Sequence, residues 1–231
     1  MFFYYDWTML ILIPGILLSL WASSRVKSAY AKYSRVYASC RMTGAEVAEH
    51  MLHAEGIYDV NIEVVGGNLT DHYDPSTRTL RLSQGVANST SLASLGVAAH
   101  ETGHALQHRD AYAPLVLRTA AVPTVNIGSN LSWPLVLAGM IFSWEPLINI
   151  GILLFSLTVL FTLITLPVEF NASSRAMKAR SSGGYLTESE LPGAKNVLSA
   201  AAMTYVAATA VALSQLLRLI LIFGGGRRRN D

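Results

Sequence analysis

The chain has 231 residues, of which 52% are hydrophobic and only 14% are charged. Soluble domains of this length usually carry about a quarter of charged residues, so the composition indicates a membrane protein. A net charge of +2 does not favour nucleic-acid binding, and a single cysteine, Cys40, excludes an internal disulfide or a cysteine-rich metal site. We interpret Cys40 as a packing residue.

Residues 1–23 are expected to form an N-terminal transmembrane anchor. The run from Trp7 to Ala22 is uncharged and has tryptophan near both ends, as in a span with aromatic anchors at the membrane interfaces. The preceding "MFFYYD" lacks the basic residues of a cleaved signal peptide, so we expect the anchor to be retained.

Residues 114–168 predict a transmembrane helical hairpin, because two apolar segments, 119–142 and 147–168, are separated only by "SWEP". If the first segment spans, its two prolines and its glycine predict a kink or a break. Residues 169–196 then form a linker, and residues 197–231 form a C-terminal hydrophobic helix, interrupted by Arg218, and a basic tail.

Basic residues mark the cytoplasmic side of a membrane protein. They cluster after the first span, at Arg25, Lys27, Lys32, Arg35 and Arg41, and after the third, at Arg175, Lys178, Arg180 and Lys195. Both clusters predict a multi-pass membrane protein with an outside N-terminus and a cytoplasmic region 24–113. The "RRR" at 227–229 disagrees, because four complete spans would place it outside; either the last segment does not fully cross or the rule fails there.

Residues 24–113 are expected to form a small α+β domain. Thr43 and Glu46 have the spacing of a capping box and begin a helix that ends at Gly56. Residues 60–65 alternate like a strand, and a proline-containing turn leads to a second strand at 77–83. A helix from Ser91 to His108 follows. We therefore predict a two-stranded sheet beside a helix, with an exposed strand edge that suits an extended peptide.

The stretch "VAAHETGHALQH", residues 97–108, predicts a metal site on that helix. Positions i and i+4 are separated by about 40° and 6 Å, so His100 and His104 reach one ion. Zinc suits such a pair, and Glu101 lies where it would take a proton from metal-bound water rather than bind the metal. Gly103 suits a close approach of another segment. Two core histidines without partners would be costly to bury.

A catalytic zinc usually has three protein ligands, so a third is expected elsewhere in the chain. On a straight helix His108 would lie about 12 Å from the first histidine, and Asp110 has the same difficulty. Glu169, in "LPVEFNASSRA", is favoured because a carboxylate among apolar residues at a membrane boundary indicates function. His72, in the strand region, and a simple ion pair between Glu169 and Arg175 are the alternatives.

Three motifs in order, "LTDHYDPSTRTLRLS", "HETGH" and "LPVEFNASSRA", resemble those of the YugP-type neutral zinc metallopeptidases of bacterial membranes. More distantly, the chain is similar to the HtpX and CAAX-prenyl-protease class. The resemblance implies an α-helical integral membrane protein with a small α+β zincin-like catalytic domain. It also implies one zinc ion per chain, held by His100, His104 and Glu169, with Glu101 as the general base near the cytoplasmic surface.

The resemblance also suggests roles for residues around the metal. Family members commonly carry Asp where this chain has Asn171, and an Asn can still orient a neighbour by hydrogen bonds. We place Asn171 and His108 behind the metal ligands. By analogy with HtpX-like enzymes, the strand at 77–83 would pair with the substrate backbone, and Asn68 or Tyr73 would lie near the bound peptide.

The expected reaction is hydrolysis of peptide bonds, in which charge on the tetrahedral oxygen needs a second donor. The candidates for that donor are Tyr73, His72, His108 and Arg175. The expected partners are a peptide or membrane-protein substrate and the lipid bilayer, without nucleic acid, and a homo-oligomer or membrane partner stays open. The alternatives are a noncatalytic membrane protein with a structural or transport-related zinc site, and an inactive homologue that acts as an adaptor.

The noncatalytic zinc protein is disfavoured by its chemistry. Structural zinc sites usually have four protein ligands and often cysteines, and this chain has one cysteine. A transporter should carry ionisable residues along several spans, whereas these spans contain almost none apart from Arg218.

Overall fold

The computed structural model describes the backbone of residues 6–224 and the side chains of that range except 179–183. The chain divides into two compact units. The helical unit comprises residues 1–22, 117–166 and 204–231, and the mixed unit comprises residues 23–116 and 167–203. The mixed unit therefore includes both the predicted α+β region and the segment that follows the hairpin.

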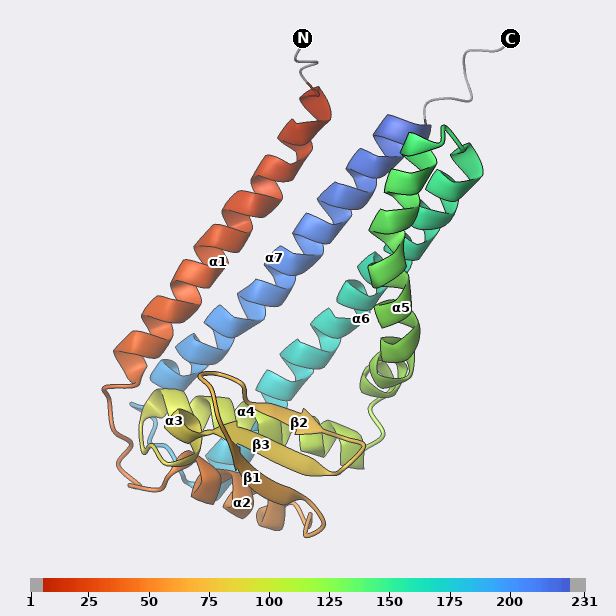
Figure 1. Ribbon diagram of the computed structural model, residues 1–231. Helices are drawn as coiled ribbons and strands as arrows, with labels where there is room; N and C mark the ends of the chain where they lie inside the picture. The colour runs from red at the N-terminus through yellow and green to blue at the C-terminus, as the bar shows by residue number, and fades with distance from the viewer. Residues whose placement is uncertain (1–5, 225–231) are drawn as a thin grey trace. The chain divides into compact units, whose positions relative to one another are not determined.

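Figure 1 shows four long helices. By residue number, each of them contributes to both units. They are α1 (Leu12–Tyr33), which follows a 3₁₀ turn η1 (Trp7–Ile11), α5 (Ala113–Ile141), α6 (Glu145–Gly183) and α7 (Leu191–Phe223). Within residues 6–224, three helical segments are long and apolar enough to cross a membrane: Trp7–Tyr33, Glu145–Lys178 and Leu191–Phe223.

Helix α5 corresponds to the first arm of the predicted hairpin and is not among these three segments. Its asparagines and prolines lower its mean hydropathy, although its 29 residues would be enough to cross a membrane. Of the expected kink or break, the break does not occur, because the helix runs without interruption through Pro123 and Pro134. The turn to α6 is as short as predicted, and Ser143 there adopts a positive φ of 51°.

Within the helical unit, the one basic residue of the last apolar run has an acidic partner. Arg218 of α7 donates from Nη2 to the Asp6 carboxylate at 2.7 Å, and Asp6 also caps η1 by accepting from the Thr8 backbone. An ion pair explains how an arginine is accommodated in so apolar a helix. It also brings the beginning of the first long helix beside the end of the last. The basic tail at 227–229 lies outside the described residues.

The first helix that lies wholly within the mixed unit is α2 (Gly44–Ala54), whose start and stop signals are as predicted. The Thr43 side chain accepts from the Glu46 backbone N–H, and the Glu46 carboxylate accepts from the Thr43 N–H, which completes the capping box. Gly56 follows the helix at a φ of +74°, a conformation that glycine adopts without strain.

The sheet has three strands rather than the two that we predicted. They are β1 (Asn61–Val65), β2 (His72–Asp74) and β3 (Thr79–Ser83), in the order β1-β3-β2. β1 runs parallel to β3, and β2 runs antiparallel to it. The sequence pattern did not predict β2, because three residues are too few to show alternation. The strand forms because a turn after Asp74 folds the chain back, so that β3 pairs with β2. The Asp74 carboxylate stabilises this turn by accepting hydrogen bonds from Ser76 and Thr77.

The central position of β3 corrects a second expectation. The strand at 77–83 was predicted to offer its edge to a substrate, but β1 and β2 occupy its two sides. Asp71, the residue just before β2, extends this pairing, because its carboxylate accepts from the Ser83 backbone N–H at 2.7 Å. Among the described strands, the open edges belong to β1 and β2.

Helix α4 (Leu92–Arg109) is the centre of the mixed unit. Its N-cap is Ser91, the residue at which the helix was expected to begin, and 14 of its 18 residues are buried. The short helix α3 (Gln84–Ala87) and the sheet cover one side of it, where Leu80, Leu82 and Ala98 share a core cluster. α2, α6 and α7 contribute to a second cluster, against which Cys40 packs and which includes Val47, Met51, Leu95, Ala99, Ala176, Ala194 and Leu198. Burial on several sides explains why α4 is so rich in alanine and glycine.

Helices α4 and α6 approach each other closely at Gly103. A Cβ added there would overlap the carbonyl oxygen of Ala172 and lie 3.0 Å from its carbonyl carbon. Since both obstacles are backbone atoms, no side-chain rotation relieves the overlap. The expectation that Gly103 permits a close approach is confirmed, and the neighbour is the helix that carries Glu169.

Gly103→Ala should therefore push the two helices apart. We expect a loss of about 1–3 kcal/mol in the free energy of unfolding, the usual cost of overpacking, together with weaker zinc binding, both measured on the full chain in detergent. The matched control is Gly96→Ala on the same helix, where the nearest atom to the new Cβ is 3.7 Å away. Equal behaviour of the two variants would contradict the close-packing argument.

Candidate metal centre

Three predicted ligands meet in the mixed unit, two from α4 and one from α6. Glu169 Oε2 lies 3.2 Å from His100 Nε2 and 3.7 Å from His104 Nε2. The two imidazoles stand one helical turn apart, with ring centroids separated by 4.9 Å and planes at 81°. His100, His104 and Glu169 offer ligand atoms that all lie within 4.8 Å of one another.

The distances from the Glu169 carboxylate to the two imidazoles fit tetrahedral coordination of a metal ion. With metal–ligand distances of about 2.0–2.1 Å, the ligand atoms around zinc are about 3.3 Å apart, and both carboxylate–imidazole distances are close to that value. Glu169 is only 1% exposed, which keeps this ligand away from bulk water. Two imidazoles and one carboxylate are also the donor set of a catalytic zinc site that leaves a position open.

Glu101 lies on α4 beside the first ligand and is largely buried. Burial raises the pKa of its carboxyl to about 6, and the charges of His100, Glu169, Asp71 and His72 act on it in both directions. A carboxylate with this pKa is mostly ionised at neutral pH yet is a better proton acceptor than an exposed glutamate. The electrostatic influence of Asp71 and His72 also indicates that the start of β2 lies near Glu101.

Each histidine has a partner for the nitrogen that faces away from Glu169. His100 Nδ1 and the Ser173 hydroxyl are 3.0 Å apart, and His104 Nδ1 and Gln107 Oε1 are 3.0 Å apart. Such partners fix the ring orientation of metal-binding histidines. Our sequence analysis missed Ser173 and Gln107, although each stands three or four residues from a ligand on its own helix, where helical neighbours meet.

Asn171 and Arg175 join this group from α6. Gln107 Nε2 donates to Asn171 Oδ1 at 3.0 Å, and Arg175 Nε donates to the same oxygen at 2.7 Å. Arg175 also forms an ion pair with Asp110 at the end of α4 and lies over the Tyr112 ring. Asn171 is thus linked to His104 through Gln107, whereas Arg175, the alternative partner for Glu169, contacts Asp110 and Asn171.

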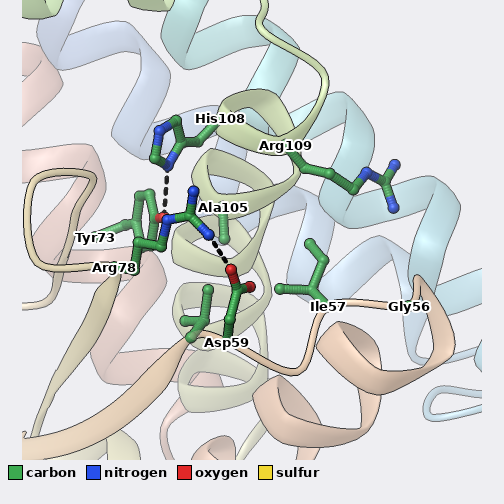
Figure 2. Close-up of a pocket in the computed structure, with 9 residues that line it drawn as sticks. Gly56, Ile57, Asp59, Tyr73, Arg78, Ala105, His108 and Arg109 are labelled. Carbon is green, nitrogen blue, oxygen red and sulfur yellow. Dashed lines mark hydrogen bonds and ion pairs between the residues drawn. The ribbon is translucent and has the colours of Figure 1, made fainter.

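Tyr73 and His108, two candidates for contact with the reacting oxygen, are hydrogen-bonded to each other. The Tyr73 hydroxyl lies 2.8 Å from His108 Nδ1, and burial raises the pKa of Tyr73 to about 12. Both line a cavity of about 250 Å³ beside Ala105, which the ion pair of Arg78 with Asp59 crosses (Figure 2). A tyrosine with so high a pKa acts as a hydrogen-bond donor and not as a base.

The remaining candidates lie at the sheet. His72 is the first residue of β2 and is exposed, with Nδ1 2.8 Å from the Thr70 carbonyl oxygen. Asn68 is exposed in the connection between β1 and β2. His72 thus belongs to the region near Glu101, and it is not a member of the group of possible metal ligands in the described part of the chain.

Comparison with known proteins supports the nature of this centre. A family model described as "Putative neutral zinc metallopeptidase" matches residues 8–224. The chain is 51% identical to the "Putative membrane protease YugP" of Bacillus subtilis (strain 168) over 218 residues, which cover 94% of this chain and 97% of that protein. No solved structure matches significantly. The chain therefore belongs to the neutral zinc metallopeptidase family of the YugP type.

Proposed function

We propose that the protein is a membrane-embedded zinc metallopeptidase that hydrolyses peptide bonds. The observation that carries the proposal is the meeting of His100, His104 and Glu169 beside the buried Glu101. A structural or transport-related zinc site does not require a further carboxylate with a raised pKa, such as Glu101, next to the ligands. Hydrolysis requires a base at that place. One zinc ion per chain is expected, since the described residues form one such cluster.

The chemistry divides between the ion and the protein. Zinc, when bound, supplies a Lewis acid that activates water and polarises the carbonyl group of a substrate. Glu101 accepts the proton of the attacking water and delivers it to the amide nitrogen that leaves. The three ligands come from two packed helices, so they hold their positions during the reaction. The Tyr73 hydroxyl is our choice among the candidates for the donor to the oxyanion, since it is hydrogen-bonded to His108, one helical turn after His104 on the motif helix.

The open edge of β2 is the better candidate for a strand that aligns the substrate. It packs against α4, and the residues that lead into it act electrostatically on Glu101. An extended peptide that paired with this edge would pass along the motif helix. Asn68 precedes this edge in the chain and would lie near one end of such a peptide. This role replaces the one that we had predicted for the 77–83 strand.

We place the site on the cytoplasmic side of the bacterial membrane. The two larger groups of basic residues follow the first and third predicted spans, and both of these positions belong to the mixed unit, which contains the metal centre. A site beside the bilayer favours membrane proteins, or peptides released near the membrane, as substrates. The named relative, a membrane protease, is consistent with this choice.

Glu101→Gln tests the proposed base. The amide keeps the size of the side chain but cannot accept a proton, so we expect cleavage of a peptide library by the purified protein to fall by about 10²–10⁴-fold while one zinc ion per chain is retained. Glu49→Gln, on the exposed face of α2, is the matched control. Undiminished cleavage by the Glu101→Gln protein would show the mechanism to be wrong, and no cleavage by the wild type would favour the noncatalytic alternatives.

Glu169→Ala tests the third ligand. Removal of one ligand of three should weaken zinc binding by at least about 100-fold, more than the loss of a residue behind a ligand. Competition with a chelator measures the affinity on the full chain. Glu145→Ala, an exposed change at the start of the same helix, should bind zinc as the wild type does. Equal affinity of the Glu169→Ala protein and the wild type would exclude Glu169 as a ligand.

A further inference from the structure

Behind His104, a chain of hydrogen bonds runs through Gln107 and Asn171 to Arg175. At each link the donor and the acceptor are fixed, and the constraint starts at Arg175. A guanidinium group only donates, so the Asn171 atom 2.7 Å from Arg175 Nε must be an acceptor, which identifies it as Oδ1. The ion pair with Asp110 holds the guanidinium group in place. Arg175 therefore sets the orientation of the Asn171 amide, because a guanidinium group cannot accept a hydrogen bond.

The next link is Gln107, which is fully buried. Its side chain faces two acceptors, Asn171 Oδ1 at 3.0 Å and the Val168 carbonyl oxygen at 2.8 Å. Both need a donor, so the amide nitrogen must point toward them and Oε1 must point the other way. A flipped amide would place three oxygens together in a buried space, which is costly.

The last link is the ring of His104. Gln107 Oε1 accepts at 3.0 Å, so Nδ1 must carry the hydrogen. In the neutral ring, Nε2 then presents a lone pair to the place where Glu169 Oε2 lies at 3.7 Å. His100 has no comparable constraint, because its partner Ser173 has a hydroxyl that either donates or accepts. The second ligand is thus fixed in the form that binds zinc, and the first is not.

We propose that Gln107 is a positioning residue that holds His104 in its zinc-binding tautomer, and that Arg175 sets the direction of Gln107 through Asn171. The inference rests on the proposed role of His104 as a zinc ligand. The same amide of Gln107 bonds the backbone at Val168, the residue before Glu169. One side chain therefore orients the second ligand and ties it to the segment that supplies the third.

The proposal is tested with two pairs of substitutions in the full chain. Gln107→Met keeps the volume of the side chain and removes the amide, whereas Gln107→Glu keeps an acceptor for His104 and loses the donor. Asn171→Leu removes the shared acceptor, whereas Asn171→Asp keeps it for both Gln107 and Arg175. Two quantities are measured: the zinc affinity by competition with a chelator, and the tautomer of His104 in the zinc-free protein by ¹⁵N NMR after histidine labelling.

In the wild type, we expect His104 to carry its hydrogen on Nδ1. Gln107→Met and Asn171→Leu should give a mixture of tautomers and a zinc affinity about 10–100-fold lower, the usual effect of losing such a partner. Asn171→Asp should stay close to the wild type in both measurements. Gln107→Glu should keep the Nδ1–H form and lose affinity, because its carboxylate faces the Val168 and Asn171 oxygens without a donor.

Two results would overturn the inference: a Gln107→Met protein with the wild-type tautomer and affinity, or an Asn171→Asp protein as impaired as Asn171→Leu. Rescue by Asp separates positioning from general loss of structure, since both changes at 171 disturb the same packing. The proposed function fails independently. If the wild type binds zinc and its tautomer responds as expected, but no peptide is cleaved, the positioning role stands and the enzymatic role does not.

Discussion

The metal centre depends on the contact between helix α4 and helix α6 at Gly103 and Ala172. The motif helix can supply only two ligands, since a third on the same helix would lie too far along its axis. The remaining ligand must come from another element that approaches closely enough for a carboxylate to reach both imidazoles. A glycine opposite a backbone carbonyl permits that approach, and Glu169 lies one turn away from the contact.

The polar contacts behind the ligands also depend on the packing of α4 against α6, because their partners come from both helices. Gln107 and Asn171 meet across the helix pair, and the ion pair of Arg175 with Asp110 joins the helices about one turn further along. Gln107 is fully buried, so its hydrogen bonds are worth more than exposed equivalents and a Gln107 without partners would be costly, whereas the Arg175–Asp110 pair is partly exposed. Packing and hydrogen bonding therefore stabilise one arrangement, in which the second and third ligands are held together.

The sequence predicted those features that depend on neighbours along the chain. The spacing of His100 and His104, the capping box at Thr43 and the short hairpin turn all follow local rules, and they were found. Strand β2 was missed because its three residues form a strand only when paired with β3. Gln107 was missed although it stands three residues after His104 on the same helix. Ser173 was missed because its contact with His100 requires α4 and α6 to be packed together, and no local pattern specifies that contact. Glu169 was found despite this, because a carboxylate at a membrane boundary is conspicuous.

The central claim is that one zinc ion is held by two imidazoles and a carboxylate from two helices. X-ray absorption at the zinc edge, on the full chain purified in detergent with one equivalent of zinc, tests this claim most directly. The account predicts nitrogen and oxygen ligands at about 2.0–2.1 Å, with the multiple scattering of two imidazole rings. A sulfur ligand at about 2.3 Å, or a spectrum without imidazole scattering, would contradict it.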